Sequence, residues 1–247
     1  EISEDVTERK LSEAEQQRAD ALKNFLADAS HDLRTPLAVA NTSVYLLRKL
    51  ITANHPIEEQ LKYVDMLGTR LDHIRKQLDD MFTLVRLDLE NALEFALEPV
   101  NPIIESLYTD YNALASNKQQ HLKLDLATDL PAVFVDSKEL QRAIGCLIDN
   151  AVAYTPQHGV ITIRTLKRGN QVVIEVEDTG IGIPGEKLPY LFDSFSPVSK
   201  ETAVRYGGTG LGLAIVKHIM LQHQGTVNVE SKPGAGAAFI CRFPAHT

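Results

Sequence analysis

The sequence predicts two domains of different class, an all-α helical hairpin followed by an α+β domain. Over the first ninety residues, apolar side chains recur at spacings of three and four, which is the period of an amphipathic helix. After Glu90 this period gives way to short β-prone runs that are mixed with helical stretches. Several adjacent strands mixed with helices are typical of an α+β layer rather than of strict βαβ alternation.

Two apolar series define the hairpin. The first runs from Leu22 to Leu47 and the second from Ile57 to Val85, with Asn54-His55-Pro56 between them. A short break between two long helices produces an antiparallel hairpin. Each series is a narrow apolar stripe with charged flanks, and a single hairpin leaves one edge of its stripe uncovered. We therefore expect two chains to pair, as a homodimer, into a four-helix bundle.

The second half contains seven β-prone runs and three helical stretches. The runs cover residues 95–100, 121–126, 132–135, 160–167, 172–178, 225–231 and 237–243, and the helical stretches cover 102–116, 137–154 and 211–224. A hairpin turn is expected at 167–171, because Gly and Asn readily adopt positive φ. The resulting domains are a coiled-coil linker at 1–20, the hairpin at 21–92 and the α+β domain at 93–247. A solvated, charged helix is equally compatible with residues 4–20.

Composition limits the functions that the chain can have. Its 44% hydrophobic and 23% charged residues exclude wholesale disorder. The net charge of −8 and the absence of Trp argue against nucleic-acid binding. Two distant cysteines, Cys146 and Cys241, favour a reduced, cytoplasmic protein over a disulfide framework. No apolar run reaches 18 residues, so we expect no membrane contact by this stretch, although an upstream anchor is compatible with a chain that begins with Glu.

A His-Asp pair on the first helix is a candidate for chemistry. His31 falls off the apolar stripe and should face solvent, and the adjacent Asp32 could orient its imidazole so that the other nitrogen is nucleophilic. Taken alone, such a pair is more often an ordinary surface feature.

Two glycine-rich segments suggest phosphate binding. One follows the strand that ends at Asp178, and the other, 207–213, runs into a helical pattern whose free backbone N–H groups could hold phosphates. Either segment alone could be a flexible loop. Gly180-x-Gly182-x-x-Gly185 matches the dinucleotide-binding fingerprint, but Pro189 interrupts the required helix and 186–210 contain no convincing strand, which excludes a Rossmann domain.

Taken together and in this order, the segments resemble the sensor histidine kinases of two-component systems. In that family a dimerisation and phosphotransfer hairpin precedes a Bergerat-type ATP-binding domain. The resemblance covers about residues 11–245, and residues 5–10 also resemble the end of a PAS sensor domain. The matching motifs are the H box FLADASHDLRTPL (25–37), the N box LIDNAVAYT (147–155), the glycine boxes DTGIGI (178–183) and GTGLGL (208–213), and the F box LFDSF (191–195).

The resemblance implies a role for each motif residue. His31 would be the phosphoacceptor, Asp32 would take its proton, and Thr35 would serve dephosphorylation of a response regulator. Asn150 would ligate Mg²⁺, and Asp178 would bind the adenine amino group of ATP. The ATP-binding residues would be Asn150, Tyr154, Asp178, Gly180, Gly182, Gly208, Thr209, Gly210, Leu211, Gly212 and Leu213. The implied partners are a response regulator receiver domain and an upstream sensor domain.

Two positions depart from the family pattern. Cys146 stands where these kinases usually carry another Asn, and Ala153 where a basic residue often contacts phosphate. They leave open a degenerate kinase that acts mainly as a phosphatase or scaffold. A gyrase- or chaperone-like conformational ATPase is a weaker alternative, because those enzymes carry a Glu where this chain has Cys146.

Overall fold

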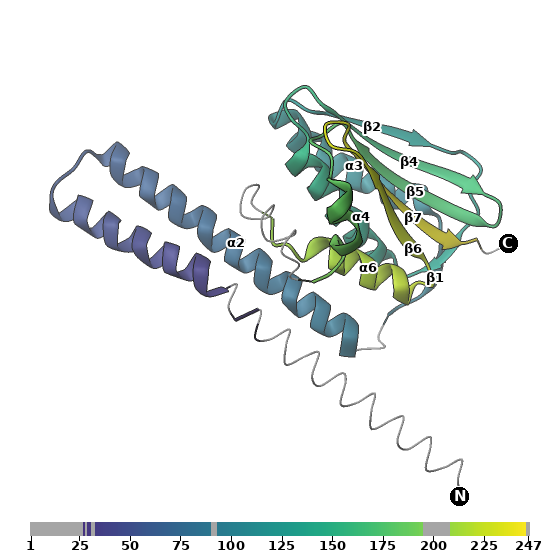
Figure 1. The fold of residues 1–247 in the computed structure, drawn as a ribbon, viewed down its shortest axis with the longest axis horizontal. Coiled ribbons are helices and arrows are strands. Elements are labelled where there is room, and N and C mark those ends of the chain that lie inside the picture. The colour runs from purple at the N-terminus through teal and green to yellow at the C-terminus, as the bar shows by residue number, and fades with distance from the viewer. Residues whose placement is uncertain (1–26, 28, 31–32, 90–92, 195–207, 246–247) are drawn as a thin grey trace, which may run out of the picture. The chain divides into compact units, whose positions relative to one another are not determined.

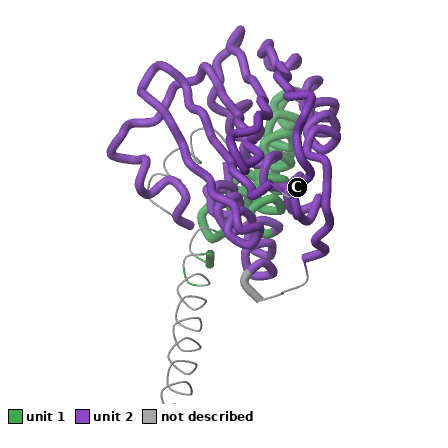
Figure 2. The backbone as a smooth tube through the Cα atoms, turned by 90° about the vertical axis from the view of Figure 1, so that its right-hand side faces the viewer, with its two compact units in different colours: residues 1–78 green, residues 79–247 purple. Residues whose placement is uncertain are grey.

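The computed structural model describes residues 27, 29–30, 33–89, 93–194 and 208–245. The chain forms two compact units, residues 1–78 and 79–247 (Figure 2). The division falls inside helix α2 (Ile57–Leu89), because the last turns of this helix pack within the second unit.

The first unit contains the predicted helical hairpin. A helix over 33–52 is followed by a short turn and by α2. In the turn Asn54 has a φ of 54°, and the His55 amide donates to the Leu50 carbonyl at 3.0 Å. Acidic side chains in the first turn of α2 favour its N-terminal dipole, and one of them, Glu59, accepts from His55 Nδ1 at 2.9 Å. The break predicted at Asn54-His55-Pro56 is therefore confirmed.

Both helices of the hairpin carry exposed apolar side chains. They include Leu37, Val39, Val44, Tyr45 and Ile51 on the first helix, and Ile57, Leu61, Val64, Met66 and Leu71 on α2. Uncovered apolar stripes on two adjacent helices are characteristic of a surface that packs against further helices. The four-helix pairing expected from the sequence would bury them.

The second unit is built on a five-stranded sheet in the order β2-β4-β5-β7-β6. Only β2 and β4 run parallel, and every other neighbouring pair is antiparallel. This topology confirms the sequence-based exclusion of a Rossmann domain. The strands are β2 (His121–Leu126), β4 (Val160–Arg168), β5 (Gln171–Asp178), β6 (Thr226–Ser231) and β7 (Ala237–Pro244), while β1 (Ala96–Glu98) pairs with β3 (Val133–Val135) in a separate small sheet.

In the part of the chain that the structure describes, three helices cover one face of the five-stranded sheet (Figure 1). They are α3 (Val100–Asn117), α4 (Ser137–Tyr154) and α6 (Gly212–Gln222), and a short 3₁₀ helix spans Gly185–Tyr190. The core lies between the helices and the sheet, where Ile144, Leu147 and Ile148 of α4 are fully buried. Asp136 caps α4 by accepting from the amides of Lys138 and Glu139, which fixes where this helix begins.

The sequence-based boundaries differ from the structure mainly around β1. This strand ends at Glu98 rather than at residue 100, and α3 begins at Val100, two residues earlier than predicted. Pro99 explains the change, because its fixed φ of −73° suits the residue before a first helical turn. The turn expected at 167–171 is confirmed, with Arg168 paired to Gln171 and a φ of 59° at Gly169.

Among the described residues, no helix is both long and apolar enough to cross a membrane.

Candidate functional site

A buried carboxylate stands at the end of β5. Asp178 is only 6% exposed, and its Oδ1 accepts a hydrogen bond from the Gly180 amide at 2.7 Å. Burial raises the pKa of this carboxyl, and hydrogen bonds from the amides of Gly180 and Ala237 act in the opposite direction. The turn after β5 therefore holds the Asp178 carboxylate in a fixed orientation at the C-terminal end of the strand.

Gly180 brings this turn against the end of α4. A Cβ atom at position 180 would lie 2.6 Å from the Tyr154 carbonyl oxygen and equally close to Asp178 Oδ1, so no side chain fits. The Ile181 amide donates to the same Tyr154 oxygen at 3.4 Å. Gly182 has a φ of 68° and lies against the Lys232 carbonyl, which fixes the other side of the turn.

The second glycine segment meets α4 about two turns earlier. A Cβ atom on Gly212, the first residue of α6, would lie 3.7 Å from Cys146 Cβ and 3.8 Å from its Sγ. Asn150 follows Cys146 by one helical turn, so the two side chains lie on the same face of α4, and both are half-buried. The face of α4 that carries Asn150 is therefore the face that meets the start of α6.

Thr209 connects this segment to the last turns of α2. Its hydroxyl donates to Asp80 Oδ2 at 2.5 Å and accepts from the Leu211 amide at 3.3 Å. Asp80 lies in the part of α2 that belongs to the second unit and is 9% exposed. No sequence signal marked Asp80, because a single Asp on a helix carries no motif.

The structure thus brings three of the predicted motifs together around α4. Three segments converge there: 147–155, 178–183 and 208–213. The predicted residues Tyr154, Gly208, Gly210, Leu211 and Leu213 belong to these segments. His31 and Asp32 lie outside the described residues. Thr35 is exposed on the helix over 33–52 of the first unit. The individual binding roles of all these residues stay predictions.

The side chains of the site suit a metal ion that is bound partly by the protein and partly by a nucleotide. Within 27–194 and 208–245, as far as these residues are described, no group of three or more His, Cys, Asp or Glu side chains converges. The Asn150 amide offers one hard oxygen ligand, which Mg²⁺ accepts alongside phosphate oxygens and water. The residues therefore fit a Mg²⁺ ion that arrives with a nucleotide and is held in part by its phosphates.

Comparison with known protein families matches both halves of the chain. Residues 21–90 match the His Kinase A (phospho-acceptor) domain, and residues 135–247 match the histidine kinase-, DNA gyrase B- and HSP90-like ATPase domain. Among curated proteins, the chain is 34% identical over 245 residues to the phosphate regulon sensor protein PhoR of Pseudomonas aeruginosa, covering 97% of this chain and 52% of PhoR. The chain thus spans about half the length of this relative.

Solved structures agree on the fold. Histidine kinase ThkA in complex with the response regulator protein TrrA superposes with a TM-score of 0.77 at 20% identity, over 94% of this chain and 64% of that chain. Full-length ShkA in complex with AMPPNP superposes with a TM-score of 0.66 at 25% identity, over 76% of this chain and 39% of that chain. With a phospho-acceptor domain followed by an ATPase domain, the chain belongs to the sensor histidine kinase family.

Proposed function

We propose that the chain is an ATP-dependent protein-histidine kinase that phosphorylates itself on His31 and passes the phosphoryl group to an aspartate of a response regulator. The observation that carries this proposal is the convergence of the N-box segment and both glycine segments around α4. A phospho-acceptor domain match that contains His31 precedes this site in the same chain.

Asp178 is the proposed adenine contact. Its buried carboxylate accepts a hydrogen bond from the adenine amino group. Guanine has a carbonyl at that position, so it would leave the carboxylate without a hydrogen-bond donor. Gly180 keeps side-chain atoms away from the base, and the start of α6 places a positive dipole end near the phosphates. The AMPPNP complex of ShkA supports nucleotide binding at a domain of this fold.

Asn150 is the proposed protein ligand of Mg²⁺. Bound with ATP, the ion would neutralise phosphate charge during transfer. Asn150 would hold it through the amide oxygen on the face of α4 that meets α6, while Thr209 and the glycine segment 208–213 enclose the phosphates.

In the proposed phosphoryl transfer, a ring nitrogen of His31 attacks the γ-phosphorus of ATP. The N–P bond forms while the bond between the γ-phosphorus and the β,γ-bridging oxygen breaks, and ADP leaves. Asp32 accepts the imidazole proton. The phosphoryl group then moves to an aspartate carboxylate of the receiver domain, which forms a P–O bond as the N–P bond breaks.

The proposed assembly is a cytoplasmic homodimer that receives its signal from an upstream sensor domain. The exposed apolar side chains of the hairpin support pairing with a second copy. The complex of ThkA with TrrA supports a response regulator as partner, since ThkA shares the fold of this chain.

A phosphatase or scaffold is the second candidate function. It is favoured by Cys146, whose thiol faces Gly212 where the family usually has an amide, and by Ala153, which supplies no cation. Both departures would weaken the binding of Mg·ATP.

Incubation with ATP labelled on the γ-phosphate tests the proposal. We expect acid-labile label on the wild-type protein and none on His31→Gln, with nucleotide affinity unchanged in the variant. Free phosphate without protein label would favour a conformational ATPase. Neither product would favour the phosphatase or scaffold, and label that persists on His31→Gln would refute His31 as the phosphoacceptor.

A further inference from the structure

Helix α4 presents two different faces to its neighbours. Cys146 and Asn150 lie on the face that meets the start of α6, where the nucleotide is proposed to bind. Gly145 and Asp149 each precede one of these residues by a single position, which turns them by about 100° around the helix axis. They face α3, so any group that holds them sets the rotation of α4.

Tyr111 of α3 contacts both of these residues. Its hydroxyl lies 3.0 Å from Asp149 Oδ1 and 3.3 Å from the Gly145 carbonyl oxygen, and can donate to either. Burial of the phenol raises the pKa of Tyr111 far above its ordinary value, with a further contribution from the charge of Asp149. The hydroxyl therefore remains a hydrogen-bond donor throughout the physiological pH range.

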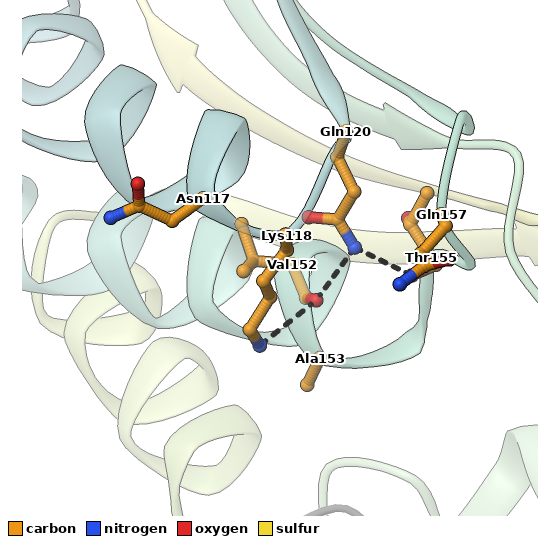
Figure 3. Close-up of a pocket in the computed structure, with 7 residues that line it drawn as sticks. All are labelled: Asn117, Lys118, Gln120, Val152, Ala153, Thr155 and Gln157. Carbon is orange, nitrogen blue, oxygen red and sulfur yellow. Dashed lines mark hydrogen bonds between the residues drawn. The ribbon is translucent and has the colours of Figure 1, made fainter.

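Side chains of the segment after α3 form hydrogen bonds with backbone carbonyls at the end of α4. Gln120 Nε2 donates to the carbonyl oxygens of Val152 and Thr155, at 3.0 and 2.5 Å, and Lys118 Nζ lies 3.4 Å from the Val152 oxygen. Figure 3 shows these contacts beside a pocket of about 360 Å³ that Ala153 also lines. They hold the last turn of α4, whereas Tyr111 acts next to Asn150 itself.

We propose that Tyr111 is a positioning residue for the metal ligand: by holding Asp149, it fixes the rotation of α4 that presents the Asn150 amide to Mg·nucleotide. This inference rests on the proposed role of Asn150.

The geometry of Mg²⁺ makes this rotation important. The ion demands near-ideal octahedral coordination, with ligand distances of roughly 2.0–2.1 Å. A side-chain oxygen about 6 Å from a helix axis moves by about 1 Å when the helix turns by about 10°. A shift of that size removes the oxygen from the coordination sphere but leaves the adenine contact on β5 in place.

Nucleotide binding with and without metal tests the proposal. The dissociation constant of AMPPNP is measured by calorimetry on the 247-residue chain, once with excess MgCl₂ and once with EDTA. For Tyr111→Phe we expect about a tenfold weaker affinity with Mg²⁺, as is typical when a group that supports a metal ligand is removed. The affinity in EDTA should stay within about twofold of wild type.

Tyr108→Phe is the matched control. Tyr108 is also half-buried on α3, three residues earlier, and its hydroxyl makes no hydrogen bond to any residue in the described part of the chain. The control should match wild type in both conditions.

Two outcomes for Tyr111→Phe would overturn the inference: an equal loss in MgCl₂ and EDTA, which would indicate general loosening or partial unfolding, or no loss in either. If the affinity of the wild type for AMPPNP did not depend on Mg²⁺, the proposed role of Asn150 as a metal ligand would be wrong. The positioning role of Tyr111, which rests on it, would then be withdrawn as well.

Discussion

The Asp178 carboxylate is almost completely buried and accepts a hydrogen bond from the Gly180 amide at 2.7 Å. A buried charge without a counter-charge costs free energy of folding, and backbone amides compensate only in part, as the raised pKa of Asp178 indicates. A buried carboxylate with a raised pKa beside two glycine turns is a candidate for ligand binding.

Asp178→Asn should therefore separate binding from stability. The amide fits the same space, but the proposed hydrogen bond to the adenine amino group loses its charge assistance, which is worth about 1.5–3 kcal/mol or roughly 10- to 150-fold in affinity. The melting temperature should stay equal or rise, because a buried charge is removed. Calorimetry with ATP and thermal unfolding measure the two effects, and wild-type affinity in the variant would eliminate the adenine assignment.

The raised pKa of Asp178 also predicts a pH dependence. Between the unfolded pKa of 3.8 and the higher folded value, the folded state binds more protons than the unfolded state. The stability of the wild type relative to Asp178→Asn should therefore fall as the pH rises through this window, and stay constant above it. Urea unfolding of both proteins at about pH 4 and about pH 7 would show this, and a pH-independent difference would contradict it.

Gly180 and Gly185 make a matched pair for testing the site geometry. A Cβ atom at position 180 would meet the Tyr154 carbonyl oxygen at 2.6 Å, whereas one at position 185 would meet nothing within 4 Å. Gly180→Ala should lower the free energy of unfolding by about 1–3 kcal/mol and weaken ATP binding, because the turn must move away from α4. Gly185→Ala should leave both unchanged. Similar denaturation midpoints for the two variants would mean that the turn at Gly180 does not pack tightly against the end of α4.

Local signals were sufficient to predict most elements. The observed bounds of β2 and α4 are those predicted from residues 121–126 and 137–154, because the apolar pattern that marks these elements acts within a few residues. The structure adds the Asp136 cap at the start of α4. The predicted start of α3 was wrong because the helix was begun at Pro102, whereas Pro99 stands directly before its first turn. Residue type alone does not choose between the two prolines.

Contacts between distant positions could not be predicted in this way. Thr209 and Asp80 are 129 positions apart, and Tyr111 and Asp149 are 38 apart. Neither pair leaves a local pattern, since each depends on how separate helices pack. The glycine and N-box motifs predicted which segments come together, whereas the groups that hold these segments in place became visible only in the folded chain.

Cys146 offers a test of the departure from the family pattern. Because its thiol faces the bare backbone of Gly212, a larger amide has room to approach the proposed phosphate site. Cys146→Asn should tighten Mg·ATP binding or speed autophosphorylation, while Cys146→Ser, which adds no amide, should do neither. Unchanged or weaker activity in the Asn variant would mean that the pocket compensates for the missing amide elsewhere.

Thr35 and Asp32 are expected to serve different reactions. Asp32 is next to His31 in the sequence and is the proposed acceptor of its proton. Thr35 follows His31 by four residues, a spacing that would place both side chains on one face of a continuous helix. The exposed Thr35 hydroxyl could orient a water molecule for attack on the aspartyl phosphate of a regulator. A structural role is the alternative, since Thr42, Thr52 and Thr69 of the hairpin each donate to the carbonyl four residues earlier.

Two variants distinguish these roles. Thr35→Ala should retain autophosphorylation within a few-fold but lose most dephosphorylation of a response regulator that the wild type has phosphorylated. Asp32→Asn should cripple autophosphorylation, because the amide cannot accept the imidazole proton. Thr42→Ala is the control, since it removes an exposed hydroxyl that donates to the Ala38 carbonyl of its own helix, and it should change neither reaction. If Thr35→Ala lost both activities together, its hydroxyl would be maintaining the helix, and the phosphatase role would have to be withdrawn.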